Sequence, residues 1–343
     1  MMMRHLLDTS GEALHAWLSA RNLPAYRAEQ IRKWLFQRRA SGFEEMTDLP
    51  TSLRDELAGE FEIWTSHTEA HRKSDDGTEK LLLELGDGER IECVLLREGP
   101  RRSICVSTQV GCAMGCVFCA SGLDGVARNL TAGEIVEQML LLARLLPEDE
   151  RISHVVAMGM GEPLANLDAL LRAFAEASSP TGLGISRRRI TISTVGLPPG
   201  IRRLAEENKG YNLAVSLHAP DDALRQELVP VSKNIKLAEI MAAADLYFDR
   251  SGRRLTYEYV LLAGVNDSPD HARRLAKLLR GRPALLNVIP YNLVAGLPYQ
   301  TPSPQAEREF RGVLEKAGIN LQFRQRKGDK IDAACGQLRR VTT

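Results

Sequence analysis

The sequence predicts an α/β protein whose largest part is an open or partial (β/α) barrel with six parallel strands. Six short segments after residue 99 are rich in Val, Ile and Leu, as in strands buried on both faces. Amphipathic helical segments separate them, which implies parallel pairing through right-handed crossovers. In such folds the functional site lies at the carboxyl ends of the strands. The predicted strands are residues 103–108, 154–158, 189–194, 213–217, 255–262 and 286–289.

Several helices of this region begin with recognisable capping signals. Thr131 and Glu134 have the spacing of a capping box. We expect Asn166 to cap the helix that follows it, and the Ser-Pro pairs at 268–269 and 303–304 to start two later helices.

Two smaller segments precede the barrel region, which we place at residues 99–343. Residues 1–65 have apolar residues at helical spacing and predict a helical accessory domain. Its basic residues are expected either to contact RNA or to form a solvated helix face; they are Arg27, Arg32, Lys33, Arg38 and Arg39.

Residues 66–98 predict a β-hairpin extension, with strands at 80–85 and 89–96 joined by a Gly-Asp-Gly turn. Alternation along the second strand puts Glu92 and Cys93 on opposite faces. Cys93 is expected to be a small core residue.

The composition is that of an ordinary globular protein. The chain has 343 residues, of which 44% are hydrophobic and 26% charged, with a formal net charge of +1. No apolar stretch is long enough to cross a bilayer and no signal peptide is evident, so we expect a cytoplasmic protein. Six cysteines in such a chain favour metal binding or catalysis over a disulfide framework.

Three cysteines follow the first predicted strand within eight residues: Cys112, Cys116 and Cys119. Thiolates at such short spacings are typical ligands of iron–sulfur clusters and zinc. Because structural sites normally take four protein ligands, three cysteines leave one position open for chemistry. The pattern favours a 4Fe–4S cluster whose unique iron binds a substrate. The alternative is a structural zinc site completed by a distant cysteine.

Small polar residues and glycines follow the other predicted strands. The candidates are Gly161 and Glu162 after the second strand, Ser193 and Thr194 after the third, Ser216, Leu217 and His218 after the fourth, and Asn292 after the sixth. Glycine allows a ligand to approach the backbone, and Glu162 is suited to accept from an ammonium group. Together these groups suit the sugar and carboxylate of a nucleoside-like ligand.

Two further cysteines lie outside the cysteine run. Cys105 lies within the first strand, and Cys335 lies in a small-residue segment near the C-terminus. Either of them is a candidate fourth ligand, and a buried strand thiol is the simpler interpretation of Cys105. Residues 321–343 contain six Arg or Lys against two Asp, a net charge of +4, which is suited to a phosphate-binding face or to solvated loops.

The longer strings around these residues resemble one family. Cys112-x3-Cys116-x2-Cys119 after the first strand of a partial barrel resembles the radical S-adenosylmethionine (SAM) enzymes. The strings STQVGC, GMGEP, SLHAP and DAACGQL, which start at Ser107, Gly159, Ser216 and Asp332, resemble the RlmN/Cfr family of RNA adenine methyltransferases, closest to the RlmN branch. The likeness covers nearly the whole chain.

The resemblance implies a role for each candidate. Cys112, Cys116 and Cys119 hold a 4Fe–4S cluster, and SAM binds its open iron. Gly161, Glu162, Ser193, Ser216, Leu217, His218 and Asn292 line the SAM pocket. Cys335 matches the cysteine that is methylated on sulfur, Cys105 the second catalytic cysteine, and Glu92 a residue proposed as a base.

The resemblance also implies a reaction. An adenosyl radical activates the methyl group on Cys335, the resulting methylene radical adds to an adenine, and a base removes the ring proton. The Cys105 thiolate then attacks the Cys335 sulfur and leaves a disulfide bond, a step that favours an accessible thiol with a low pKa. The expected product is adenine methylated at C2 in 23S rRNA, with tRNA as a further candidate substrate. A reductant such as flavodoxin or ferredoxin resets the enzyme, which is expected to be a monomer without membrane contact.

Three alternatives remain at this point. The same machinery can methylate C8 of adenine, as in the Cfr branch. The second alternative is a non-catalytic RNA-binding protein with structural zinc. The third is a radical enzyme that acts on a small molecule or a protein.

Overall fold

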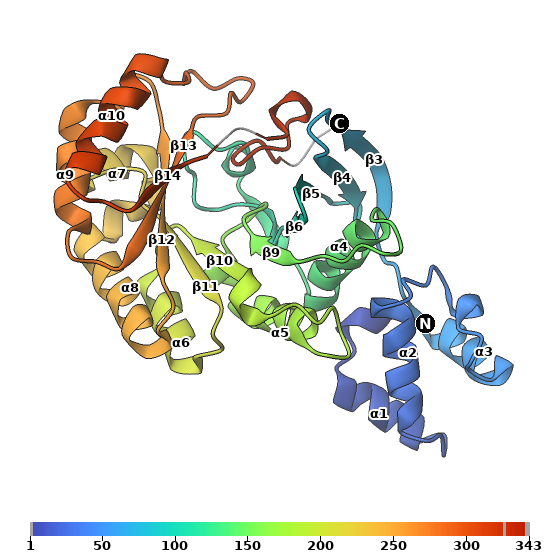
Figure 1. Ribbon diagram of the computed structural model, residues 1–343. Coiled ribbons are helices and arrows are strands. Elements are labelled where there is room, and N and C mark those ends of the chain that lie inside the picture. The colour runs from blue at the N-terminus through green and yellow to red at the C-terminus, as the bar shows by residue number, and fades with distance from the viewer. Residues whose placement is uncertain (1–2, 325–326, 340–343) are drawn as a thin grey trace.

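A curved ten-stranded sheet runs through the molecule in the computed structural model, which describes residues 3–324 and 327–339 (Figure 1). The strand order is β14-β13-β12-β11-β10-β9-β6-β5-β4-β3. Strands β6 and β9–β14 are parallel to one another, whereas β3, β4 and β5 form an antiparallel extension in which β5 pairs antiparallel with β6. The parallel strands are β6 (Arg101–Cys105), β9 (His154–Ala157), β10 (Ile190–Thr194), β11 (Asn212–Ser216), β12 (Leu255–Leu261), β13 (Ala284–Pro290) and β14 (Leu321–Phe323).

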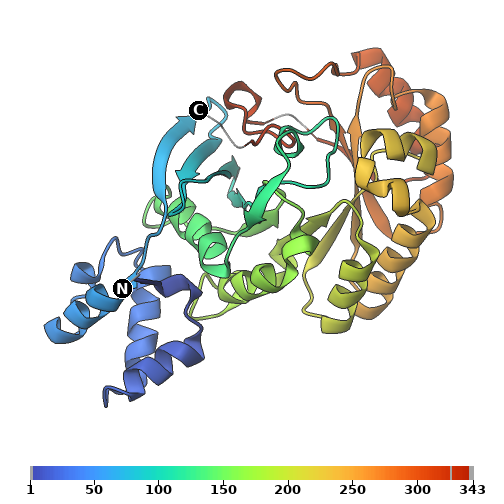
Figure 2. The same cartoon turned by 180° about the vertical axis from the view of Figure 1, so that it is seen from behind.

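All six strands predicted for the barrel region are confirmed. Strand β14 was not predicted, because three residues within a basic segment give too short an apolar pattern. Helices cover the outer side of the curved sheet, as the two opposite views show (Figures 1 and 2). They are α4 (Ala132–Arg144), α5 (Leu167–Ser178), α6 (Pro198–Glu207), α7 (Asp222–Leu228), α8 (Leu237–Ser251), α9 (Pro269–Leu279) and α10 (Pro304–Lys316).

Three of the four predicted helix caps are confirmed. Thr131 forms the capping box of α4, and the hydroxyls of Ser268 and Ser303 accept backbone hydrogen bonds at the starts of α9 and α10. The prediction for Asn166 is wrong. Its amide instead donates to the carbonyls of Thr108 and Leu130, both at 2.8 Å, and so ties two loops together beneath the barrel mouth.

The antiparallel extension consists of β3 (His67–Lys73), β4 (Glu79–Glu84) and β5 (Arg90–Glu98). The predicted hairpin is β4 and β5, and Cys93 is fully buried as expected. Strand β3 escaped prediction because it is a polar edge strand whose side chains are largely exposed. A separate two-stranded sheet pairs β7 (Gln109–Gly111) with β8 (Val126–Asn129).

The N-terminal region forms a small helical unit at one end of the molecule, drawn in blue in Figure 1. It contains α1 (Gly11–Ser19), α2 (Tyr26–Phe36) and α3 (Thr51–Glu60), closed by a parallel pairing of β1 (Arg4–His5) with β2 (Phe61–Glu62). Arg32 donates to Thr181 and Arg39 to the carbonyl of Leu146, so these two basic residues fasten the helices to the barrel.

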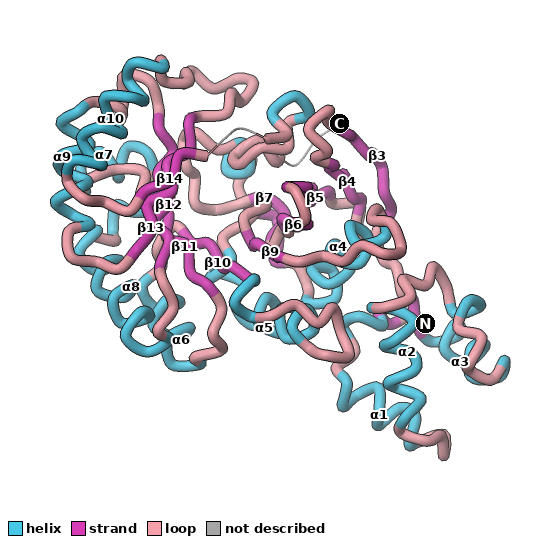
Figure 3. Tube along the Cα trace, in the orientation of Figure 1, coloured by secondary structure: helices cyan, strands magenta, loops and turns pink. Residues whose placement is uncertain are grey.

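Short 3-10 helices connect several elements: η1 (Leu6–Asp8), η2 (Phe43–Glu45), η3 (Ala120–Gly122), η4 (Pro163–Asn166), η5 (Arg187–Arg189), η6 (Pro230–Asn234) and η7 (Asp329–Ile331). Loops dominate the region between the barrel mouth and the antiparallel extension (Figure 3). Of the basic residues counted at the C-terminus, Arg326 and Arg340 lie outside the described residues. Among the described helices, none is both long and apolar enough to span a membrane.

Candidate active site

The three clustered cysteines lie in one loop, residues 112–125, between β7 and β8. We call it the cysteine loop. The pairing of β7 with β8 closes its base, and the backbone N–H of Cys112 donates to the carbonyl of Gly125 at 2.8 Å. All three thiols are partly exposed and line one pocket, the cysteine pocket, at the carboxyl ends of the parallel strands. Because burial raises the pKa of each thiol, thiolates in this loop need a positive partner.

The donor set of this loop is three thiols that line one pocket. Structural zinc sites normally take four protein ligands, whereas three thiolates can hold a 4Fe–4S cluster and leave one iron open. The residues of the loop therefore fit such a cluster.

Glycines let the segment that follows β9 approach residues 106–109, at and before the start of β7, beside this pocket. Gly161 has a φ of +100°, and a Cβ there would lie 2.6 Å from Cβ of Gln109. A Cβ on Gly159 would lie 2.7 Å from the carbonyl oxygen of Val106. A side chain at either position would collide with residues 106–109, so glycine is needed for this close packing.

Most predicted pocket residues do meet at the cysteine pocket. Its walls include Gly161, Glu162, Ser193, Ser216, His218 and Asn292, from five strand ends and loops that are far apart in the sequence. Leu217 differs, because its side chain is fully buried in the hydrophobic core and only its backbone N–H is used locally, donating to the carbonyl of Glu258.

Glu162 has a different environment from the one expected of an ammonium acceptor. Its carboxylate accepts backbone N–H groups of Val195 at 2.8 Å and Leu164 at 3.0 Å. Burial raises its pKa, and these donors partly offset the effect. Glu162 therefore joins the ends of β9 and β10, and supports the pocket wall as well as lining it.

His218 is held as a neutral imidazole. Its Nδ1 accepts the backbone N–H of Val260 at 3.1 Å, which leaves the proton on Nε2. Burial, assisted by the charge of Arg225, lowers the pKa of His218 to about 3. The ring packs edge-on against Phe118 of the cysteine loop, with centroids 4.8 Å apart. His218 thus offers a hydrogen-bond donor to the pocket without adding charge.

Two polar atoms on the pocket wall are buried without partners. They are Oδ1 of Asn292 and the hydroxyl of Tyr291. Buried polar groups are normally hydrogen-bonded, so an unpartnered pair marks a place for a polar ligand. The amide of Asn292 also donates to the carbonyl of Cys335 at 3.1 Å, which links this wall to the C-terminal segment.

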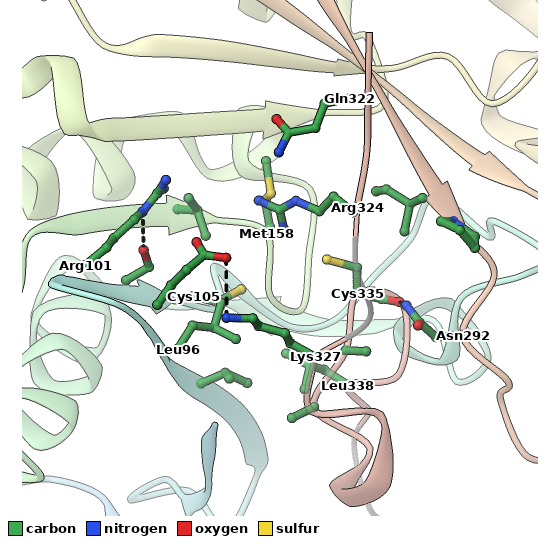
Figure 4. Close-up of a pocket in the computed structure, with 18 of the residues that line it drawn as sticks. Leu96, Arg101, Cys105, Met158, Asn292, Gln322, Arg324, Lys327, Cys335 and Leu338 are labelled. Carbon is green, nitrogen blue, oxygen red and sulfur yellow. Dashed lines mark hydrogen bonds and ion pairs between the residues drawn. The ribbon is translucent and has the colours of Figure 1, made fainter. Parts of the chain in front are cut away.

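A second cavity, of about 370 Å³, opens beside the cysteine pocket where the barrel is incomplete. We call it the thiol cavity because Cys105 and Cys335 both face it (Figure 4). Its volume lies in the range of small-molecule sites. Cys335, Met158, Ile289 and Asn292 line both cavities, so Cys335 stands at their junction. Both thiols are free.

The two thiols differ in accessibility. Cys335 is exposed to the cavity, whereas Cys105 on β6 is only 8% exposed. Burial raises the pKa of Cys105 to about 12, and the nearby Cys335 adds to the effect. The expectation of an accessible, low-pKa thiol is therefore not met in this state. Arg324, on the cavity wall, opposes the rise at both cysteines.

Comparison with known proteins identifies the family. Residues 106–276 match the radical SAM superfamily, and residues 4–63 match the ribosomal RNA large subunit methyltransferase N-terminal domain. A probable dual-specificity RNA methyltransferase RlmN from Rhodopirellula baltica is 63% identical over 336 residues, 98% of this chain and 91% of that protein. The chain belongs to the RlmN family.

Other relatives agree with this assignment. The RlmN protein of Symbiobacterium thermophilum is 50% identical over 92% of this chain and 86% of its own. A crystal structure of a radical SAM methyltransferase from Sphaerobacter thermophilus superposes with a TM-score of 0.95 at 43% identity, covering 98% of this chain and 99% of that one. RlmN proteins are radical SAM enzymes, so the cofactors are a 4Fe–4S cluster and SAM. The residues that line the cysteine pocket fit both.

The structure places Glu92, the predicted base, behind the thiol cavity and not on its wall. Its carboxylate pairs with Lys80 at 2.7 Å and accepts the backbone N–H of Arg339 at 3.0 Å. Lys80 also donates to the carbonyl of Asp332 at 2.9 Å. This geometry does not support proton removal by Glu92. Its buried ion pair with Lys80 instead fixes both ends of the segment that contains Cys335.

We call residues 327–339 the C-terminal loop. Its other side is fixed to the cysteine loop: Ala120 N–H donates to the carbonyl of Gly336 at 2.8 Å, and the Ser121 hydroxyl donates to the carbonyl of Leu338. No motif in the sequence indicated this role for residues 120–121. Lys327 pairs with Glu98 at 3.3 Å and Lys330 with Asp75 at 2.9 Å, so part of the basic charge serves internal contacts.

Two carboxylates on the cavity walls were missed by the sequence analysis. Glu98 lies at the end of β5 and lines the thiol cavity. Glu258 on β12 lines the cysteine pocket; it is buried, accepts from the amide of Asn287 at 2.6 Å, and burial raises its pKa to about 7. A charged residue within the apolar run Leu255–Leu261 was the available signal for Glu258.

Proposed function

We propose that this protein methylates C2 of an adenine in RNA, with Cys335 as the methyl carrier and Cys105 as the resolving thiol. The observation that supports it is the position of Cys335, which lines both the cysteine pocket and the thiol cavity. One side of this residue faces the cofactors and the other faces a space of a size that suits a nucleobase. The RlmN relatives carry the name of dual-specificity RNA methyltransferases, which supports both rRNA and tRNA as substrates.

Different residues of the chain have different roles in this proposal. Cys112, Cys116 and Cys119 hold the cluster, and the walls that contain Ser193, Ser216, His218 and Asn292 orient SAM. When bound, these cofactors supply the methyl group and, after one-electron cleavage of SAM, the adenosyl radical that activates it.

Cys335 then acts as carrier in the thiol cavity. Its sulfur takes a methyl group and gives up the thiol proton. Loss of one hydrogen atom from that methyl group leaves a methylene radical, which forms a carbon–carbon bond with the adenine ring. Loss of the ring proton to a carboxylate, and of one electron that the oxidised cluster would take up, leaves the adenine joined to the Cys335 sulfur through a methylene group. The candidate proton acceptors are Glu98, which lines the thiol cavity, and Glu258, which lines the cysteine pocket.

Cys105 completes the turnover. Its thiolate attacks the Cys335 sulfur and a disulfide bond forms; the carbon–sulfur bond breaks, and the methylene carbon keeps the electron pair and takes up a proton to give methylated adenine. Because burial holds the pKa of Cys105 near 12, its proton must be removed in the complex. The positive charge of Arg324 beside both thiols favours that thiolate. Two electrons from a reductant such as flavodoxin or ferredoxin then reopen the disulfide bond.

The proposal is tested by the chromatographic retention and fragmentation of the modified nucleoside, because the C2 and C8 isomers have the same mass. Anaerobically reconstituted protein is incubated with SAM, reductant, and either 23S rRNA fragments or tRNA transcripts, and digested RNA is analysed by mass spectrometry against 2-methyl- and 8-methyladenosine standards. We expect 2-methyladenosine from both RNAs. A product that contains only 8-methyladenosine overturns the choice of C2, and methylation of only one RNA overturns dual specificity.

We also propose that the protein works as a monomer in the cytoplasm. Size-exclusion chromatography with light scattering on the reconstituted protein, with and without RNA, tests the monomer. A second protein copy in the active fraction contradicts it.

A further inference from the structure

Arg225 is a buried cation without an anionic partner. It lies on α7, is 1% exposed, and is among the largest fully buried side chains of the described chain. Its guanidinium donates to two main-chain carbonyls, those of Val195 and of Ser216, the latter at 3.3 Å. Its Nε has no hydrogen-bond partner. Across residues 3–324 and 327–339, no carboxylate forms an ion pair with it.

A buried charge of this kind is costly. Removing an ion from water carries a large free-energy penalty, which an opposite charge must offset. The acidic residue one helical turn before Arg225 is Asp222, but its Oδ1 accepts the backbone N–H of Leu237 at 2.7 Å. Nothing in the described chain thus explains why a guanidinium is kept at this position.

The cysteine loop lies directly against α7. The backbone N–H of Val117 donates to the carbonyl of Leu228 at 3.1 Å. Phe118, Leu228 and Val229 form one apolar cluster, and Cys116 packs against it. The missing anion therefore belongs to this loop.

A cluster held by three thiolates is an anion, and it becomes more negative when it accepts an electron. We propose that Arg225 is the permanent counter-ion of the cluster, and that its positive charge raises the reduction potential of the cluster and favours electron uptake. Net charge close to an iron–sulfur cluster is one of the terms that set its potential. Arg225 does not line either cavity, so it acts through space and not by contact with SAM or RNA.

The first test is a redox titration of the reconstituted cluster without RNA, followed by electron paramagnetic resonance. Arg225→Met removes the charge, and Arg225→Lys keeps it. At a fixed potential we expect at least a tenfold lower ratio of reduced to oxidised cluster in the Met variant, a midpoint shift of about −59 mV for a one-electron couple. The Lys variant should stay close to the native midpoint. An unchanged midpoint in Arg225→Met overturns the proposal.

The matched control is Arg203→Met. Arg203 is a partly exposed residue on α6 that pairs with Asp168, away from the cysteine loop. Its removal should leave the midpoint unchanged. A shift equal to that of Arg225→Met would mean that the potential follows overall charge, which also overturns the assignment.

The second test compares the melting temperatures of the native protein and a variant, each with and without the cluster. It is needed because a variant that loads iron poorly cannot be titrated. Arg225→Gln keeps an amide donor for the Val195 carbonyl but lacks the charge. Since the cluster supplies the counter-ion, loading should raise the melting temperature of the native protein more than that of Arg225→Gln. Equal increases for both proteins overturn the proposal. Both tests are independent of RNA methylation, so failure of the proposed function leaves them intact.

Discussion

The cysteine pocket and the thiol cavity lie side by side, but the chain builds them in different ways. The three cysteines that we propose as cluster ligands come from a single loop whose base is closed by β7 and β8. The two thiols that we propose as catalytic come from β6 and from the C-terminal loop, which is fixed on both sides. The first site is local in sequence and the second depends on long-range contacts. Substitutions at one site should therefore affect cofactor binding, and substitutions at the other should affect methyl transfer.

The largest separation is expected for Cys335→Ala compared with Cys112→Ala. Without Cys335 there is no methyl carrier, so RNA methylation should fall below detection while iron content and SAM cleavage remain. Cys112→Ala should lose the cluster and, with it, all activity. Iron analysis and quantified 5′-deoxyadenosine distinguish the two. Methylated RNA from the Cys335 variant would show that the carrier lies elsewhere.

Cys105→Ala should stop the reaction one step later. The covalent adduct between RNA and Cys335 should accumulate, because no thiol releases it. The adduct is visible as a slower band on denaturing gels, and it should disappear in the double variant with Cys335→Ala. Normal turnover by Cys105→Ala would show that Cys105 does not resolve the adduct.

Lys80→Met tests whether the ion pair behind the thiol cavity holds that site together. It leaves the buried carboxylate of Glu92 without its partner, which should cost about 3–5 kcal/mol of stability. Urea denaturation of the cluster-free protein measures the loss. The cysteine loop is fixed separately, so iron loading should persist while methyl transfer slows.

The comparison with Glu92 variants sharpens this experiment. Glu92→Gln should loosen the C-terminal loop and thereby slow methyl transfer. We expect an effect similar to that of Lys80→Met. If Glu92→Gln blocked proton removal while Lys80→Met remained active, Glu92 would be the base after all, and Glu98 and Glu258 would lose that role.

The smallest effect should come from a region remote from both cavities. His5 pairs with Glu137 at 3.2 Å where the helical unit meets α4, and its hydrogen bonds to Asp8 and Glu137 outweigh burial and raise its pKa from 6.5 to about 9. A raised folded-state pKa stabilises the protein fully below pH 6.5, and the contribution is lost as pH rises through 9. We expect thermal stability to decline across that window by about 3 kcal/mol at most.

His5→Gln is the control for this pH dependence. It should flatten the decline between pH 6.5 and 9 and leave cluster loading unchanged. A decline of the same size in the variant would assign it to another group.

The local site could be predicted from the sequence, and the long-range one only in part. Cysteine spacing predicted the cysteine loop, and the alternation of strands and helices predicted which ends would meet it. The position of Glu92 could not be predicted, because alternation gives the face of a strand but not what covers that face. Likewise, the capping prediction for Asn166 failed because tertiary contacts to Thr108 and Leu130 used its amide. Arg225 has no motif, and only its burial reveals it.

The hydrogen bond from Ser121 to Leu338 joins residues separated by 217 positions. A ribosome makes the cysteine loop long before it makes the segment that closes over it, and domains form in that order during synthesis. A growing chain therefore presents its cysteines before the segment that covers them exists. The C-terminal loop, which covers the cysteine loop, is the last part of the described chain to be synthesised.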